Sequence, residues 1–437
     1  MSTVTTGTTD KVTFSENTSM TTSTLDPRAP ATPNSLRQDA HLIGLVGVAH
    51  MISHFSQLLL PPLFPWLKDA LNASYTELGF LMTIFFVVSC VTQTLSGFAV
   101  DKYGPRPILF GGLTLLALAA FGYSISTSYW MMAGFTALAG VGNGVFHPVD
   151  YTLLNRKVSA ARLGHAYSTH GMTGSLGWAL APALLVPLTL AYSWRVALMA
   201  AGTLAFVVLA VLILNRDKLH LENAAPAKAK AGVAATAQEG SLDFLKIPAV
   251  WMCFGFYLLF AIVISVIQAF APEAARQLHG VPLAMAAVCL TIYMVCNAGG
   301  MVIGGFLVSD PARCERIVGI AFAVAATLAL TLGFANLPAM AVPVMFGFMG
   351  VTAGIAGPSR DLLVKKSTPA NSTGRVYGVV YSGLDIGQAI SPLFFGALMD
   401  RHQYSAVFVG MATVQLMLVA SAFGMQRARR SQILNAT

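Results

Sequence analysis

The chain has 437 residues, of which 55% are hydrophobic and only 10% carry a charge. A soluble domain of this length needs a more polar surface, so this composition argues against a soluble protein and indicates a polytopic membrane protein. The net charge of +8 reflects basic residues gathered in alternate loops, so it gives no reason to expect nucleic-acid binding.

The first 40 residues are rich in Thr and Ser and contain no apolar run. We expect residues 1–40 to be disordered and cytoplasmic, without a cleaved signal peptide. Twelve apolar stretches follow, each long enough to cross about 30 Å of hydrocarbon as a helix. They are centred near residues 54, 89, 117, 142, 177, 204, 259, 295, 325, 352, 388 and 414.

A low-complexity sequence, AAPAKAKAGVAATAQEG, lies within residues 215–246 and predicts a cytoplasmic linker. The fold class that we expect is an all-α polytopic membrane protein with twelve transmembrane helices in two pseudo-symmetric six-helix bundles. The bundles would span residues 41–214 and 247–425, and residues 426–437 would form a cytoplasmic tail.

Lys and Arg are unevenly divided between the two predicted sides of the membrane. With both termini in the cytoplasm, all but four of the 26 Lys and Arg residues lie on the cytoplasmic side. The exceptions are Lys68, Arg195, Arg276 and Arg401. The positive-inside rule therefore predicts cytoplasmic termini for a multi-pass protein, which we expect in a bacterial inner membrane.

The two halves of the chain contain a repeat. A shift of 210 residues aligns the segment 144–182 with the segment 354–392 without a gap. Identical pairs include Gly144/Gly354, Pro148/Pro358, Tyr167/Tyr377, Gly177/Gly387 and Pro182/Pro392. Transporters built from repeats bind cargo near the bilayer midplane, where the halves meet, so the repeat predicts a site between them.

The loop between the second and third spans reads GFAVDKYGPRP, from Gly97 to Pro107. Gly97 would allow a neighbouring helix to approach closely. Asp101 could face the positive end of a helix or pair with a nearby Arg or Lys side chain. Gly104 and the proline after it predict a tight turn.

This loop resembles the GxLxDRxGRR signature of the major facilitator superfamily, and a degenerate form, GGFLVSDPARCER, occupies the equivalent loop of the second half. The resemblance implies two six-helix bundles around a central cavity and a cytoplasmic latch in the outward-open state. It therefore implies gating roles for Gly97, Asp101, Gly104 and Arg106.

Within that superfamily, GVGNGVFHPVDY, from Gly140 to Tyr151, and the later GSLGWALAP resemble the fosmidomycin-resistance branch, which favours efflux. The drug/proton antiporter pattern RxxQG would place its Arg at Gly140 and its Gln at Asn143, so that Arg is missing. Uptake of an organic anion or a vitamin-like metabolite therefore stays open as the alternative.

Two polar stripes have the same helical spacing. His50, His54 and Gln57 fall at i, i+4 and i+7 in the first span, and Asn143, His147 and Asp150 do so in the fourth. We expect both stripes to line the cavity and bind substrate, with Asp150 coupling protons. Alternatively, the first stripe bonds to neighbouring helices, and Asp150 caps its helix against Arg156 or Lys157.

Three further features complete the predicted site. Pro148 frees the carbonyl of Gly144 and predicts a local helix break. The repeat pairs Asp150 with Arg360, which predicts a gating ion pair across the cytoplasmic side; alternatively, Arg360 pairs with Asp361 or snorkels to the interface.

In the eleventh span, Asp385 could take up a proton on one side of the membrane and release it on the other, and Gln388 would bind substrate with Asn297 of the eighth span. A permanent salt bridge between Asp385 and Arg360 is the alternative. His165 and His170 are expected to bond between helices.

These features predict a secondary transporter, coupled to protons, that moves a small organic solute by alternating access. The partners are the solute, protons and the lipid bilayer, the protein is expected to work as a monomer, and no nucleic acid is involved. No P-loop is present, and neither an enzyme, a cofactor nor a metal site is expected, because His50 and His54 alone are a weak metal signal. A non-transporting membrane receptor is the rival class.

Overall fold

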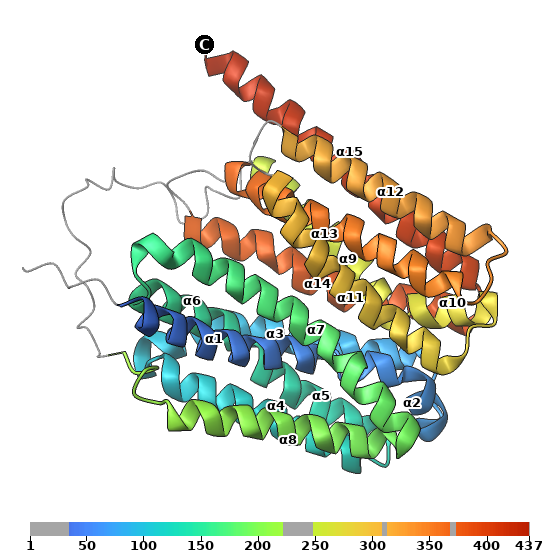
Figure 1. The fold of residues 1–437 in the computed structure, drawn as a ribbon, viewed down its shortest axis with the longest axis horizontal. Coiled ribbons are helices and arrows are strands. Elements are labelled where there is room, and N and C mark those ends of the chain that lie inside the picture. Colours follow the sequence, from blue (N-terminus) through green and yellow to red (C-terminus); the bar gives the residue numbers. More distant parts are fainter. Residues whose placement is uncertain (1–34, 222–247, 308–312, 368–372, 437) are drawn as a thin grey trace, which may run out of the picture.

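The computed structural model describes residues 35–221, 248–307, 313–367 and 373–436, and within these ranges it is built of helices without a strand (Figure 1). Most of the predicted N-terminal segment and of the predicted linker therefore lies outside the described residues. The first helix begins at Leu36, where Ser35 and Gln38 form a capping box.

Helices of the first half pack mainly with one another: α1 lies along α7, and α4 along both α5 and α8. The elements of this half are α1 (Leu36–Gln57), η1 (Pro61–Leu63), α2 (Phe64–Leu71), α3 (Tyr75–Tyr103), α4 (Pro105–Ile125), α5 (Tyr129–Asn143), α6 (Phe146–Lys157), η2 (Ala160–Arg162), α7 (Leu163–Ala191) and α8 (Trp194–Leu214).

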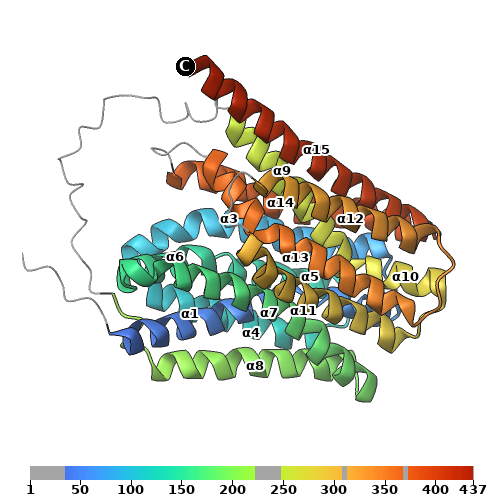
Figure 2. The same ribbon diagram turned by 45° about the horizontal axis from the view of Figure 1, so that its top comes forward.

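The second half is arranged similarly, with α9 along α14, α11 along α13, and α12 along α15 (Figure 1). Its helices are α9 (Pro248–Ala269), α10 (Ala271–His279), α11 (Leu283–Leu307), α12 (Cys314–Phe334), α13 (Ala341–Ser367), α14 (Thr373–Asp400) and α15 (Tyr404–Ala436). Figure 2 shows α9, α12 and α15 of the second half above α1, α4 and α8 of the first half.

Ten helices within the described residues are long and apolar enough to cross a membrane. The fourth predicted span is not among these ten, because it is divided into α5 and α6, each shorter than 18 residues. The break confirms the one predicted beside Pro148: Pro148 has no N–H for the Gly144 carbonyl, which instead accepts a hydrogen bond from Ser96 Oγ at 3.1 Å.

Among the described residues, two helix pairs make most of the contacts between the halves, α3 with α14 and α7 with α11. A shift of 210 residues places α3 near α11 and α7 on α14, so the two contacts are equivalent under the sequence repeat. The repeat therefore describes the interface between the halves as well as the halves themselves.

Repeat-related glycines make equivalent close contacts. A Cβ at Gly177 would lie 2.2 Å from the Met51 carbonyl oxygen of α1, and one at Gly387 would lie 2.5 Å from the Leu258 carbonyl oxygen of α9. A Cβ at Gly144 would lie 2.5 Å from the Ser89 carbonyl oxygen of α3, and one at Gly354 would lie 2.1 Å from the Asn297 carbonyl oxygen of α11. Only glycine allows these helices to approach so closely, which explains the identity of both pairs.

The halves are bound together most closely at one end, which we call the α10 end because α2 and α10 lie there. At the end of α14, Asp400 accepts hydrogen bonds from the Tyr75 and Thr76 backbone N–H groups, at 2.7 and 2.9 Å, and from Thr76 Oγ1 at 2.6 Å. A carboxylate of the second half thus caps the first turn of α3 in the first half.

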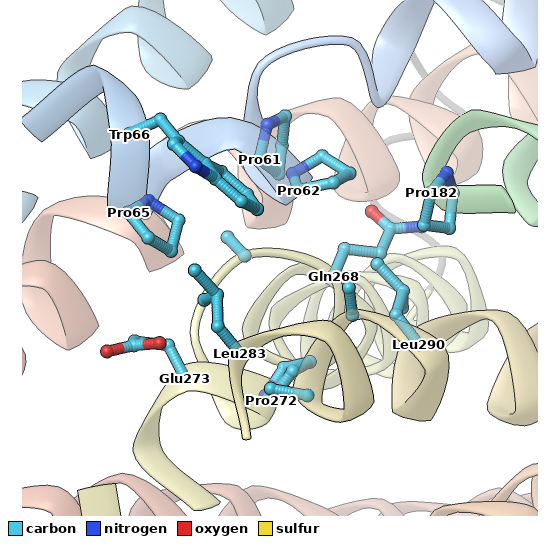
Figure 3. A pocket seen from close by; sticks show the side chains of 13 residues that line it. Pro61, Pro62, Pro65, Trp66, Pro182, Gln268, Pro272, Glu273, Leu283 and Leu290 are labelled. Atoms are coloured by element: carbon cyan, nitrogen blue, oxygen red, sulfur yellow. The ribbon is translucent and has the colours of Figure 1, made fainter. Parts of the chain in front are cut away.

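A small proline-rich pocket lies at the same end (Figure 3). It is lined from the first half by the Pro61 to Trp66 segment and Pro182, and from the second half by Gln268, Glu273 and Leu290. Beside it, the hydrogen bond to Glu273 raises the pKa of the Arg276 guanidinium above its ordinary value. None of the predicted substrate-binding residues lines this pocket, which lies at the α10 end.

Candidate transport site

Three helices of the first half, α1, α6 and α7, bring four histidines and one aspartate together. Asp150 of α6 is fully buried, and its Oδ2 lies 3.1 Å from both His50 Nδ1 of α1 and His170 Nε2 of α7. The His50 and His170 rings stack at 3.5 Å between centroids. The buried carboxylate therefore joins α1 to α7.

Two further histidines flank this core. The His54 ring lies 4.4 Å from that of His50 and also 4.4 Å from that of Trp178, and the His147 ring lies 5.4 Å from that of His50. Both His54 and His147 are half-buried, whereas His50 is almost completely buried. We call His50, His54, His147, Asp150 and His170 the His–Asp cluster.

A second network, one turn farther along α1, connects α1 to α5 and α7, and α5 to α3, through the amides of Asn143 and Gln57. Asn143 Oδ1 accepts from Ser53 Oγ at 2.8 Å and from Gln57 Nε2 at 3.4 Å, and Asn143 Nδ2 donates to Ser89 Oγ at 2.9 Å. Trp178 Nε1 donates to Gln57 Oε1 at 3.0 Å.

The two predicted stripes thus face each other. His50 and Gln57 bond to neighbouring helices, which was the alternative for the first stripe, and Asp150 bonds to histidines instead of capping its helix against Arg156 or Lys157. His54 and His147 are the half-buried members of the two stripes.

Partly exposed aromatic side chains continue from the cluster towards the end opposite α10. Tyr151 and Tyr167 are each about two-fifths exposed, their rings lie 5.7 Å apart, and Tyr151 also lies 5.3 Å from His170. At this end Phe98 of α3 and Phe306 of α11 are exposed as well. The helices that join the halves therefore carry uncovered apolar side chains away from the α10 end.

The predicted residues of the second half lie on three helices. Arg360 of α13 lies over the Phe260 ring at 4.3 Å and near the Tyr257 ring of α9 at 5.6 Å. The pairing proposed between Arg360 and Asp150 is not formed here, since Asp150 bonds to His50 and His170.

Asp385 lies across the interface from the first half. It is half-buried on α14 and within hydrogen-bonding reach of the Cys90 thiol of α3. Gln388, one turn on, is buried, and its Oε1 has no hydrogen-bond partner among the described residues; Asn297 is half-buried on α11. The Asp385 carboxyl therefore lies at the contact of α3 with α14 between the halves.

The predicted gating loop confirms one expectation and corrects another. Gly104 joins α3 to α4 with a φ of 83°, which glycine adopts without strain, so the predicted tight turn is present. The close helix approach expected at Gly97 is wrong for this conformation, because a Cβ there would meet none of the described residues within 4 Å. Asp101 is exposed and Arg106 half-buried.

Sequence reasoning did not identify His170 and Cys90 as members of the site. His170 lies 20 residues from Asp150, and Cys90 is on a different half from Asp385, so no periodicity within one helix connects them. Only the helix packing brings them together.

Helices long enough to cross a membrane, a two-half repeat and a buried polar site define a multi-pass membrane transport protein. The model of the Major Facilitator Superfamily matches residues 46–392 and 315–435, and the chain belongs to this superfamily. The prediction that the protein is not an enzyme is thereby confirmed.

Curated relatives match part of the chain. The fosmidomycin resistance protein of Escherichia coli is 28% identical over 193 residues, which are 42% of this chain and 44% of that protein. The MFS-type transporter YfnC of Bacillus subtilis is 30% identical over 149 residues, 33% of this chain and 36% of that protein. The membrane sensor protein UhpC of Salmonella typhimurium is 26% identical over 39% of each chain. Each match thus spans less than half of the relative.

Solved structures share the fold. A bacterial homologue of the human lysosomal transporter Spinster, in an inward-facing and occupied conformation, matches with a TM-score of 0.74 and 13% identity, over 90% of this chain and 98% of that chain. The D-xylose–proton symporter matches with a TM-score of 0.71 and 14% identity, over 87% of this chain and 96% of that chain.

Proposed function

We propose that this protein is a proton-coupled secondary transporter that moves a small organic solute by alternating access, with efflux as the favoured direction. The observation that carries the proposal is the buried His–Asp cluster, which lies inside the first half while Asp385 faces that half from the second. Titratable groups inside a membrane are costly and mark solute or proton pathways.

The proposal includes the twelve-span architecture that the sequence predicts. Besides the ten candidate spans, α5 with α6 and α14 would cross the membrane, which gives twelve spans in two six-helix bundles. The distribution of Lys and Arg supports cytoplasmic termini in a bacterial inner membrane. Both halves lie in one chain, so a monomer holds the whole pathway.

In this arrangement the α10 end faces away from the cytoplasm and is closed, and the cavity is open towards the cytoplasm. His54, Gln57, Asn143 and His147 of the first half, with Asn297 and Gln388 of the second, would contact the solute, as would His50 once the cluster rearranges. Asp385 is the proton carrier that we favour, and Asp150 is the second candidate. Gly97, Asp101, Gly104, Arg106 and Arg360 would close the cytoplasmic side in the opposite state.

Two alternatives rest on specific observations. The resemblance to the D-xylose–proton symporter fold and the absence of the antiporter Arg at position 140 keep uptake of an organic anion or vitamin-like metabolite in view. The similarity to a membrane sensor protein supports a non-transporting receptor as the second alternative. Transport assays distinguish all three.

Replacing Asp385 with Asn tests the coupling. In proteoliposomes with an internal pH dye and a panel of solutes, we expect solute-evoked proton movement for the wild type and at least about a tenfold loss for Asp385→Asn, because an amide cannot carry the proton. The sign of proton movement relative to solute flux separates antiport from symport. Solute flux without proton movement, unchanged in the variant, would contradict the role of Asp385.

Replacing Asp400 tests the closed end. Asp400→Ala removes three hydrogen bonds between α14 and the start of α3 and should open the α10 end, because two backbone N–H groups lose their acceptor. A cysteine placed at Thr76 loses the hydroxyl's hydrogen bond but keeps the two backbone hydrogen bonds to Asp400, and we expect it to react with an impermeant maleimide several times faster in Asp400→Ala than in the Asp400 background. Asp217→Ala, an exposed change elsewhere, is the control, and equal rates in all three would contradict the latch.

A further inference from the structure

The His–Asp cluster holds more polar atoms than hydrogen bonds. Among the described residues, His54 Nδ1 and Nε2, His147 Nδ1 and Asp150 Oδ1 are buried without a hydrogen-bond partner. Each such atom costs free energy inside a membrane protein, where lipid offers no replacement for water. Four unpartnered atoms within one small group of side chains indicate that something absent from the protein itself completes the cluster.

The donor atoms already converge. One ring nitrogen from each of His50, His147 and His170 lies within 4.8 Å of the other two, and Asp150 Oδ2 lies 3.1 Å from a nitrogen of both His50 and His170. A bound ion would need these atoms to close in until each lies about 2.0–2.2 Å from it. His147, the half-buried ligand, has the most room to move.

The chemistry of these donors selects the ligand. Imidazole nitrogens suit zinc, copper, nickel and cobalt, whereas magnesium and calcium prefer oxygen. Three imidazoles and one carboxylate are a four-ligand set, and the Asp150 carboxylate offsets part of the charge that a divalent ion brings into the membrane.

We propose that His50, His147, His170 and Asp150 form a binding site for a first-row divalent cation of the zinc, cobalt or nickel kind. No metal site was expected from sequence, because the three histidines come from three helices and only His50 and His54 lie close in the chain. The proposal does not depend on the direction of transport or on Asp385 as the proton carrier. Cation binding and protonation exclude each other at these donors, since a metal takes neutral imidazole and ionised carboxylate.

Cobalt titration tests the site. The full chain, purified in detergent with any affinity tag removed and metal stripped by a chelator, is titrated with Co²⁺ and followed by visible absorption and by elemental analysis after dialysis. We expect one cation per chain. His147→Gln and His170→Gln should each weaken binding by about 100-fold or more, because even the loss of an outer hydrogen-bond partner costs 10- to 100-fold.

Two further variants separate ligand loss from misfolding. His165→Gln changes an exposed histidine on the same helix as His170 and should bind Co²⁺ like the wild type. His147→Cys should retain binding and add a thiolate-to-cobalt band in the near ultraviolet, which only a sulfur bound directly to the ion produces. Absence of stoichiometric Co²⁺ binding to the wild type, equal binding by His170→Gln, or His147→Cys binding without that band would overturn the proposal.

Discussion

Gly177→Ala should destabilise the protein by about 3 kcal/mol or more, at the upper end of the range for overpacked cores. A Cβ at this position would lie 2.2 Å from the Met51 carbonyl oxygen and 3.0 Å from His54 Cβ, so α1 and α7 must separate to admit it. Since the His–Asp cluster spans these two helices, their separation would also weaken the hydrogen bonds of Asp150.

A thermal unfolding midpoint in one detergent measures this effect. Gly171→Ala on the same helix is the matched control, because a Cβ there would meet none of the described residues within 4 Å. Gly387→Ala should behave like Gly177→Ala, since its contact with α9 is the repeat equivalent. If Gly177→Ala melted at the same temperature as Gly171→Ala, the close packing of α1 and α7 would be wrong.

Asp150→Ala is the second large effect that we expect. The change leaves a nitrogen of His50 and one of His170 without their shared acceptor, and each orphaned buried group costs about 1–3 kcal/mol. Asp150→Asn keeps one acceptor oxygen in nearly the same place, so it should lose less stability than Asp150→Ala. Unfolding midpoints should therefore fall in the order wild type, Asp150→Asn, Asp150→Ala.

Asp217→Ala serves as the control for Asp150→Ala, since Asp217 is 95% exposed and its contact with Arg216 is 4.0 Å long. Its unfolding midpoint should match that of the wild type. A destabilisation of Asp217→Ala equal to that of Asp150→Ala would show that the loss is unrelated to the cluster.

Local patterns in the sequence account for much of the first half of the site. Helical spacing predicts one face for His50 with Gln57 and one for Asn143 with Asp150, although the structure divides the second pair between α5 and α6. Pro148 predicts the freed carbonyl of Gly144, which accepts a hydrogen bond from Ser96. The spacing could not show that the two faces meet, because that depends on how α1 and α6 pack. His170 joins them from a third helix, and no periodicity connects it to His50.

The repeat was the most informative sequence feature for the fold. The identity of Gly177 with Gly387 reflects the same close helix contact in each half, and α3 with α14 and α7 with α11 are equivalent contacts between the halves. The contact between Cys90 and Asp385 could not be foreseen, because it depends on the conformation in which the halves meet. Gly97 illustrates a similar limit, since the motif predicted a close helix contact that the described residues do not make in this conformation.

Alternating access requires one half to tilt against the other, and distances between the halves at both ends of the molecule test this movement most directly. Spin labels on cysteines at Ala70 and Gln277 report the α10 end, and labels at Ser168 and Phe306 report the opposite end, in a background without the native cysteines; all four positions are exposed. We expect Asp400→Ala to lengthen the first distance and shorten the second, because opening one end closes the other. Distances that stay fixed, or that both lengthen, would contradict alternating access.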